Sequence, residues 1–321
     1  MREIIFLEPV FKSMIWGGDR LQKEFGYAIP DDHTGECWAI SAHPKGDCGI
    51  RGGSYEGRTL SWLWKNHREL FGNMSGEVFP LLVKIIDAKA DLSIQVHPND
   101  SYAKEKEGGA LGKTECWYIL DCPEQGTLVL GHNARDKEEL KELIAKKRWE
   151  ELIRQRPIKK GDFLQIEPGT VHAIKAGTML LETQQSSDVT YRLYDYDRLD
   201  HGKPRQLHLA RSIDVIRCPH VEPQQQVRIK HYGDCREEEL VRCSYYTVLK
   251  LTLRGRQELK QPHNFLNVSV IHGAGSIDGI PIRKGDHFIL PAGYGSYLLE
   301  GDLELIESYA TMEGRYDGGR L

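Results

Sequence analysis

The sequence predicts a mainly β protein, a sandwich or barrel of short strands, on the basis of two observations. Short runs in which apolar and polar residues alternate, such as 247–254 and 266–270, dominate the chain and are separated by Gly, Pro, Asp and Asn. In addition, one strand–turn–strand unit occurs twice. Such an internal repeat is typical of two copies of one β module.

The repeated unit is Ile-Lys-Lys-Gly-Asp-Phe at 158–163, which is echoed by Ile-Arg-Lys-Gly-Asp-His-Phe at 282–288. An apolar strand and a turn follow each run, with the turns at 168–170 and 291–293. The first turn leads to His172, whereas the second leads to a segment without histidine. We therefore expect the first copy to bind a metal ion and the second to have lost that site.

The apolar pattern is interrupted at 219–226, where two prolines and three consecutive glutamines predict a domain boundary. We expect a metal-binding catalytic domain at 1–220 and a degenerate β domain at 221–321. A short helical insert is expected in the first domain, at about 58–72 and 135–156.

Each part of this insert has its own signal. The first has apolar residues at helical spacing, namely Leu60, Leu63, Trp64, His67 and Phe71. The second opens on Asp136-Lys137-Glu138-Glu139, which resembles a capping box and precedes further apolar residues at helical spacing.

Composition restricts the partners and the compartment. The net charge of −4 and the lack of basic clusters interleaved with aromatic residues argue against a nucleic-acid partner. The longest apolar runs stop far short of the roughly 20 residues that span a bilayer, and the first residues lack the apolar segment of a signal peptide. Seven scattered cysteines without a CxxC pair are expected to be reduced thiols in a cytoplasmic protein.

Four residues predict a metal site. Gln95 and His97 lie two apart in an alternating run, so their side chains should project from one face of a strand. Glu115 lies in a second strand-like run and His172 directly follows a third. Two imidazoles, a carboxylate and an amide oxygen suit a divalent cation with room for water or substrate. Ligands without thiolate favour Zn²⁺, with Fe²⁺, Co²⁺ and Mn²⁺ as alternatives.

The alternative for each histidine is a local hydrogen bond without metal, but the combination with a glutamine and a glutamate on strands favours ligation. Four other histidines have no comparable strand context and are weaker candidates, namely His132, His201, His208 and His220.

Several cations accompany the predicted ligands. Lys84 interrupts the apolar run 81–86, and a buried ammonium without a partner is costly. Lys113 lies two residues before Glu115, and Arg192 lies in a strand-like segment after Glu182. Converging lysine and arginine side chains would suit an anionic, phosphorylated substrate. The alternative is that both lysines extend to solvent.

Taken together, these motifs resemble the type I mannose-6-phosphate isomerases (phosphomannose isomerases), in particular their short bacterial form. The resemblance covers most of the chain, and its most specific part is Ser-Ile-Gln-Val-His-Pro at 93–98, at a fixed distance from Lys84. Further matching segments are 16–18, 35–38, 41–44, 81–84, 112–115 and 168–173. The large helical domain of the longer members has room here only as a short insert.

The resemblance implies a cupin (jelly-roll) fold and the reversible interconversion of mannose 6-phosphate and fructose 6-phosphate through a cis-enediol. It also implies one zinc ion per chain, held by Gln95, His97, Glu115 and His172. The family's pocket residues match Lys84, Lys113, Glu182 and Arg192, and its substrate-facing serine matches Ser93.

An aldose–ketose isomerase needs a base and a stabiliser for the developing oxyanion. We expect the metal and Arg192 to stabilise that charge. Glu182, Lys84 and Lys113 all qualify as the base, as does a metal-bound water, because burial or a neighbouring charge can bring a side-chain pKa near the working pH.

Two alternatives compete with this enzyme. One is a sugar-phosphate-binding metal cupin without turnover, which would keep the ligands but lack a working base. The other is a cupin oxygenase, which the fourth ligand Gln95 and the lysines disfavour. The expected partner is a small-molecule sugar phosphate, and the protein is expected to be a monomer or a homodimer.

Overall fold

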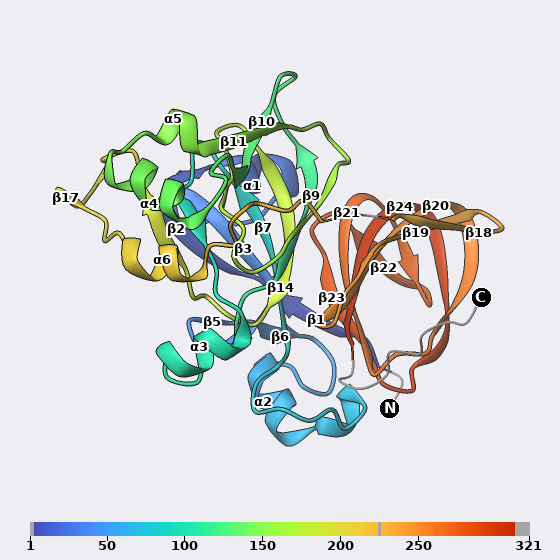
Figure 1. Cartoon of the computed structure of the whole chain (residues 1–321). Helices are drawn as coiled ribbons and strands as arrows, with labels where there is room; N and C mark the ends of the chain where they lie inside the picture. Colours follow the sequence, from blue (N-terminus) through green and yellow to red (C-terminus); the bar gives the residue numbers. More distant parts are fainter. Residues whose placement is uncertain (1–2, 224–225, 312–321) are drawn as a thin grey trace, which may run out of the picture. The chain divides into compact units, whose positions relative to one another are not determined.

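The computed structural model describes residues 3–223 and 226–311, and most of the regular structure is β-strand, as the sequence predicts (Figure 1). Contacts divide the chain into two compact units. Unit 1 consists of Met1–Val10, Trp38–Val83 and Gln225–Leu321, and unit 2 of Phe11–Cys37 and Lys84–Gln224. The domain division at 220/221 stays a prediction, and unit 1 contains two N-terminal segments in addition to the C-terminal part of the chain.

Unit 1 is built on a nine-stranded antiparallel sheet in the order β18-β19-β20-β24-β21-β23-β1-β6, with β22 paired to β21. Its strands are β1 (Ile5–Glu8), β6 (Gly49–Arg51), β18 (Arg228–Tyr232), β19 (Cys235–Arg242), β20 (Tyr246–Gln261), β21 (Phe265–Ile277), β22 (Ile280–Arg283), β23 (His287–Pro291) and β24 (Gly295–Ala310). Strands β20 and β24 pair over their full length, from Tyr246 opposite Ala310 to Gln261 opposite Gly295. Alternate residues of these long strands therefore face one apolar core.

The first helical stretch also lies in unit 1, after the short hairpin of β4 (Ala42–His43) and β5 (Gly46–Asp47). It forms α2 (Leu60–Asn66) and the 3₁₀ turn η1 (Arg68–Phe71), separated at His67, whose φ of −133° is not helical. Its apolar face is buried as the spacing predicts.

Unit 2 contains a five-stranded sheet and most of a six-stranded sheet. The six-stranded sheet has the order β12-β9-β14-β7-β3-β2 and the five-stranded sheet the order β11-β10-β13-β8-β15. The first comprises β12 (Phe163–Ile166), β9 (Glu115–Asp121), β14 (Met179–Gln185), β7 (Leu81–Asp87), β3 (Thr34–Ile40) and β2 (Val10–Gly18). The second comprises β11 (Ile153–Pro157), β10 (Thr127–His132), β13 (His172–Ala173), β8 (Ile94–Val96) and β15 (Tyr191–Tyr194). A small hairpin joins β16 (Leu199–Asp200) to β17 (Lys203–Pro204).

Helices cover one face of the five-stranded sheet. The helices of this unit are α1 (Arg20–Phe25), α3 (Asp100–Lys106), α4 (Lys137–Ala145), α5 (Trp149–Leu152) and α6 (Leu209–Val215). Helix α4 begins at the predicted cap, where Asp136 accepts a hydrogen bond of 2.8 Å from the Glu139 amide. Its inner residues share one buried cluster with Ile94 and Val96 of β8.

Strand alternation then sends the neighbours of Ile94 and Val96 to the opposite side. Gln95 and His97 point away from the helix-covered face, into the space between the two sheets. Trp117, Ile119 and Leu180 make part of that interior apolar. Two residues further along the same strands lie the buried ionisable side chains of Glu115 and Glu182. Local alternation therefore places the candidate site inside unit 2.

The repeated sequence forms the same turn in both copies. Gly161 and Gly285 have φ values of 90° and 95°, which glycine adopts without steric cost. The aspartate that follows each glycine accepts a backbone hydrogen bond, Asp162 from the Lys159 amide at 2.9 Å and Asp286 from the Arg283 amide at 2.8 Å. A strand, β12 or β23, begins directly afterwards. The two copies of the repeated sequence therefore share the same local structure.

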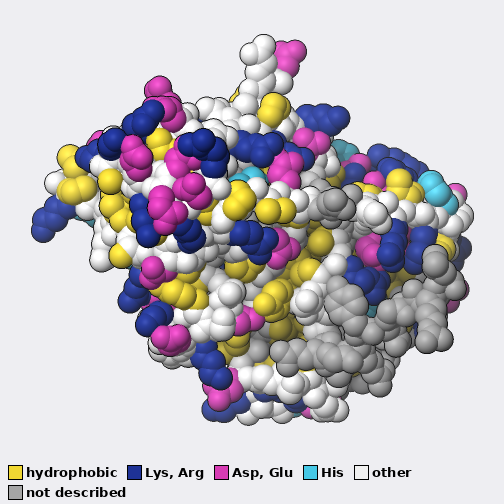
Figure 2. Space-filling model, in the orientation of Figure 1, with side chains coloured by type: hydrophobic (Ala, Val, Ile, Leu, Met, Phe, Trp, Pro, Cys, Tyr) yellow, Lys and Arg dark blue, Asp and Glu magenta, His cyan; other side chains and the backbone are white. Residues whose placement is uncertain are grey.

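The surface shows no segregation of charge on the face drawn in Figure 2, where basic and acidic side chains are interspersed. Among the residues that the structure describes, none of the helices has the length and hydropathy of a membrane span. The seven cysteines are free thiols.

Candidate metal centre and active site

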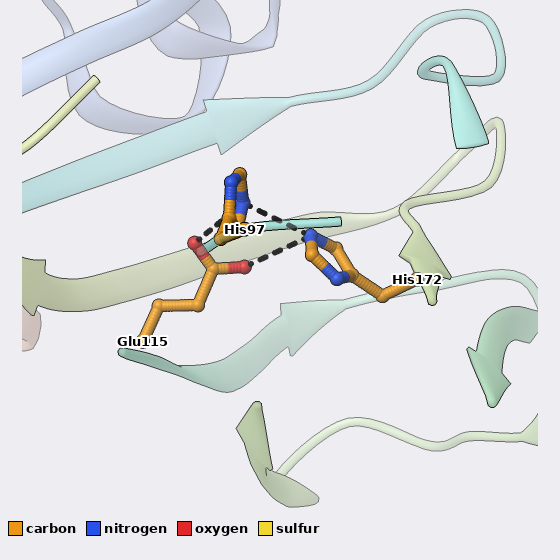
Figure 3. A group of neighbouring side chains, drawn as sticks. All are labelled: His97, Glu115 and His172. Atoms are coloured by element: carbon orange, nitrogen blue, oxygen red, sulfur yellow. Dashed lines mark hydrogen bonds and ion pairs between the residues drawn. The ribbon is translucent and has the colours of Figure 1, made fainter. Parts of the chain in front are cut away.

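Three of the four predicted ligands converge inside unit 2 (Figure 3). One ligand atom from each of His97, Glu115 and His172 lies within 4.8 Å of the other two, and all three side chains are buried. They come from different places: His97 directly follows β8, Glu115 begins β9, and His172 begins β13. Of the groups of histidine, cysteine and acidic residues among the described parts of the chain, this is the one with metal-like spacing.

Backbone carbonyls fix the orientation of both imidazoles. The Nδ1–H of His97 donates to the Val189 carbonyl at 2.8 Å, and that of His172 donates to the Thr170 carbonyl at 2.8 Å. Each Nε2 therefore carries a lone pair, and the two Nε2 atoms face each other at 3.1 Å. Burial lowers the pKa of His97 well below its ordinary range and that of His172 to about 4, which keeps both rings neutral.

Glu115 adds two more acceptor oxygens to the same point. Its Oε1 lies 3.4 Å from His172 Nε2 and its Oε2 lies 3.5 Å from His97 Nε2. Both oxygens are buried and neither accepts a hydrogen bond of good geometry, although Lys113 Nζ lies 2.9 Å from Oε2. Burial, and then the neighbouring Glu182 carboxylate, raise the pKa of Glu115 to about 7.

Gln95 lies in the same row of residues. It is the cross-strand partner of His172 on one side and of Arg192 on the other. Its Nε2 is 3.3 Å from His172 Nε2, and a half-turn of the amide would present Oε1 at that position instead. The glutamine can therefore complete the acceptor cluster.

This donor set fits a divalent cation. Lone pairs on two neutral nitrogens and a carboxylate repel one another in a buried site unless a positive charge lies between them. Ligand atoms about 2.1 Å from a tetrahedral ion are roughly 3.4 Å apart. The spacings of 3.1, 3.4 and 3.5 Å between the three groups are close to that value.

The predicted lysines are buried in a network of alternating charge. Lys113 Nζ lies 2.9 Å from Glu115 and 3.9 Å from Glu182. Lys84 Nζ lies 3.6 Å from Glu182 and 3.7 Å from Glu36. Both lysine side chains are about one-twentieth exposed, so the alternative that they extend to solvent is wrong.

Glu182 lies at the middle of this network. Its Oε2 accepts a hydrogen bond of 3.0 Å from the indole of Trp117, while its buried Oε1 accepts none. Burial alone would raise the pKa of Glu182, but Lys113 and Lys84 outweigh that effect and lower it. Burial opposes the charge of Lys113 too, yet the attraction of Glu115 and Glu182 prevails and raises its pKa.

Arg192 lies on β15, next to Gln95 in the sheet. Its Nη1 donates to the Gln206 carbonyl at 3.3 Å, while its Nε is buried without a hydrogen bond. Within the described ranges no carboxylate lies within ion-pair distance of its guanidinium, and burial and then Arg205 lower its pKa. Its unsatisfied donor is suited to an anionic oxygen.

Ser93 is buried directly before β8 and has the same strand parity as Gln95 and His97. Of the weaker histidine candidates, His132 binds the Arg217 carbonyl and His208 accepts from the Arg192 amide, so each has a local hydrogen bond.

Sequence reasoning missed Glu36 as a site residue. It lies in β3, where every residue is buried, and its carboxylate is the last member of the charge network. The sequence signal was weak: Glu36 directly precedes the apolar run Cys37–Ile40, and a buried acid there demands a partner.

Comparison with known proteins shows which family the chain belongs to. Residues 4–121 match the family described as "Phosphomannose isomerase type I, catalytic domain", and residues 236–310 match "Mannose-6-phosphate isomerase, cupin domain". The mannose-6-phosphate isomerase ManA of Bacillus subtilis is 51% identical over 96% of this chain and 99% of its own. The chain belongs to the type I phosphomannose isomerase family. The predicted cupin fold and family are thereby confirmed.

Two solved structures extend the comparison. The mannose 6-phosphate isomerase of Bacillus subtilis superimposes with a TM-score of 0.94 at 48% identity, covering 95% of this chain and 99% of that one. A phosphomannose isomerase variant from Salmonella typhimurium shares the fold at 16% identity, with a TM-score of 0.77 over 96% and 100% of the two chains.

The charge network predicts strong coupling between Lys84 and Glu36. Replacing Lys84 by Met removes the cation that lies between the buried carboxylates of Glu36 and Glu182, so the free energy of unfolding should fall by about 3 kcal/mol or more. In the Lys84→Met/Glu36→Gln double variant one of these charges is gone, and the loss should be smaller than the sum of the single losses. A double-mutant cycle by urea denaturation measures the coupling, and strictly additive losses would show that Glu36 is not a partner of Lys84.

Proposed function

We propose that the protein interconverts mannose 6-phosphate and fructose 6-phosphate, with its buried acceptor cluster holding a divalent metal. The observation that carries the proposal is the position of this cluster, which directly adjoins an alternating network of carboxylates and lysines. The relatives named above are isomerases of this sugar phosphate, and a non-catalytic cupin would have no use for several ionisable groups buried beside the ligands.

We propose zinc as the metal, one ion per chain, held by Gln95, His97, Glu115 and His172. Neutral imidazoles, one carboxylate and one amide are ligands that zinc accepts in a catalytic site. Bound zinc would act as a Lewis acid that polarises the sugar carbonyl and stabilises negative charge on its oxygen.

Glu182 is the proposed proton-transfer group. The reaction moves a proton between C1 and C2, which requires a base that is ionised before the substrate arrives. The two lysines keep Glu182 ionised, and Trp117 holds one of its oxygens while the other accepts no hydrogen bond. Lys113 is a weaker candidate for the base because its raised pKa keeps it protonated.

The cations are proposed to bind and orient the anionic substrate. Lys84 and Lys113 balance only two of the three buried carboxylates, so a divalent cation would reverse the sign of the site's charge. Arg192 adds a further positive charge and an unsatisfied donor. We propose that Arg192 stabilises the negative charge that develops on the substrate oxygen. Ser93, Lys84 and Lys113 are proposed to bind the substrate.

The remaining expectations stay proposals. Free thiols at all seven cysteines are compatible with a reducing cytoplasm. A monomer and a homodimer are both compatible with one complete site within one chain.

Metal dependence is tested by assaying conversion of mannose 6-phosphate with protein as isolated, chelator-stripped and re-supplied with Zn²⁺. Activity should be lost on stripping and restored by zinc. His97→Ala should lose both metal content and turnover, whereas His132→Ala, which removes a histidine outside the cluster, should keep both. A zinc-loaded protein without turnover would favour the non-catalytic cupin.

The proton-transfer role predicts that Glu182→Gln lowers kcat by about 10²- to 10⁴-fold. Zinc content and KM should change little, because the amide keeps the shape and the contact with Trp117. Glu167→Gln, a change of the same kind outside the site, is the control. If Glu182→Gln turned over substrate nearly as fast as the parent, Glu182 would not be the base.

Stabilisation of the oxyanion by Arg192 predicts that Arg192→Ala lowers kcat/KM by about 10²-fold or more while zinc content is kept. Arg156→Ala, on the same sheet but away from the site, should be nearly neutral. Zinc content is measured by atomic absorption and folding by circular dichroism. Joint loss of metal, folding and activity would instead give Arg192 a structural role.

A further inference from the structure

Unit 1 contains a cavity of about 250 Å³ that the proposed reaction does not use. Its walls come from β18, β19, β20, β21 and β24 and from the turn that joins β20 to β21, all within this unit. The residues that matter most are Glu237, Leu249, His263, Tyr297, Glu307 and Tyr309.

Glu307 is an acid at a position where the strand pattern demands an apolar residue. On β24 the alternate residues Leu303, Leu305 and Tyr309 enter the apolar core of unit 1, and Glu307 has the same parity. It is 3% exposed, and the hydrogen bond that the structure gives its carboxyl is a long one of 3.5 Å from the Tyr297 hydroxyl. Among the described residues no lysine, arginine or histidine lies within ion-pair distance of it.

The other acids of the cavity have cationic partners of their own, which Glu307 lacks. Glu239 is paired with Arg242 at 2.6 Å, and Glu237 lies 3.7 Å from Lys230. Burial, and then repulsion by Glu237, raise the pKa of Glu307 to about 8, while the Tyr297 hydroxyl acts in the opposite direction.

Lys230, Arg242 and Lys260 also line the cavity, but none lies within ion-pair distance of Glu307. The first two pair with Glu237 and Glu239, and Lys260 is exposed. Cys235 of β19 is buried beside these acids, and its own pKa is raised to about 12. Opposite Glu307, β20 and β21 present Leu249 and Val268. Among the described residues, the carboxylate form of Glu307 therefore has no cation within ion-pair distance.

The walls around this carboxyl are aromatic and aliphatic. Tyr297 and Tyr309 are buried, and the His263 ring stacks on Tyr309 with centroids 3.6 Å apart and an interplanar angle of 12°. Leu249, Leu251 and Leu266 complete the inner wall. Tyrosine faces attract cations, and leucine walls favour a hydrocarbon body.

We propose that this cavity binds a small organic cation, an ammonium group carried on an apolar body, with the ammonium against Glu307 and the body between Leu249, Tyr297 and Tyr309. An anion placed against Glu307 would be repelled by its carboxylate, because the lining cations Lys230 and Arg242 already pair with other acids. A purely apolar ligand would leave the carboxyl uncompensated. A metal ion lacks ligands, because the acids and Cys235 do not form a group of three with metal-like spacing. The inference is independent of the isomerase reaction.

Benzylamine and benzyl alcohol provide matched probes, because they share the apolar ring and differ in the charge of the polar group. Isothermal titration of the full chain at pH 7 should show benzylamine binding at least tenfold more tightly than the alcohol. Glu307→Gln should remove that preference. Glu300→Gln, which alters an exposed acid of the same strand paired with Arg256, should keep it.

Proton linkage gives a second, independent readout. Glu307 must lose its proton to pair with the ammonium, so the affinity for benzylamine should rise about tenfold per pH unit below pH 8. Titrations in two buffers of different ionisation enthalpy should show a released proton, and Glu307→Gln should release none. This variant should fold normally, because it removes a group that resists ionisation in the folded state; its melting temperature at pH 8 checks this.

Equal binding of the amine and the alcohol, or an amine preference that survives in Glu307→Gln, would overturn the proposal. Failure of both probes to bind at millimolar concentration would overturn it as well. Isomerase turnover, measured in parallel for Glu307→Gln, should equal that of the parent, so this result stands apart from the outcome of the metal and active-site experiments.

Discussion

The structure of unit 2 depends on the burial of five ionisable side chains of alternating sign. Four consecutive strands of the six-stranded sheet supply them: Lys113 and Glu115 at β9, Glu182 on β14, Lys84 on β7 and Glu36 on β3. Each charge is tolerated in the interior because a charge of opposite sign lies within 4 Å of it, on the next strand or, for Glu115, at Lys113 beside the same strand. The charges therefore favour one strand order, and the same order brings the row of charges to the acceptor cluster.

The acceptor cluster imposes the complementary constraint on the five-stranded sheet. Two carbonyls turn the lone pairs of His97 and His172 inward, and Glu115 from the other sheet meets them. The apolar residues that alternate with Gln95 pack under α4, which fixes the register of β8. Helix packing on one face thus determines which atoms converge on the other, and a cation would relieve the repulsion between them.

Much of this could be predicted from the sequence because alternation and residue chemistry act locally. Gln95 and His97 share a face by strand geometry alone, and Lys84 signals a buried partner by its apolar surroundings. Which partner it has depends on strand order, which no local pattern encodes. Glu36 was missed for this reason, and because it precedes an apolar run after Thr34 and Gly35, whereas Lys84 has apolar residues on both sides. The choice between Glu182 and Lys113 as base likewise required the distances between strands.

The two β modules treat a buried charge in opposite ways. Both contain the same Gly-Asp turn, which shows that the turn belongs to the shared architecture and not to the chemistry. In unit 2 every buried acid of the site faces a lysine or the imidazoles, whereas in unit 1 Glu307 faces leucines, tyrosines and another acid. The segment after the second turn contains no histidine, yet the strand that begins there, β24, carries the buried acid Glu307. An acid retained without an internal partner costs folding free energy, so its compensation must come from a proton or from a ligand, and the cavity beside Glu307 provides the space for one.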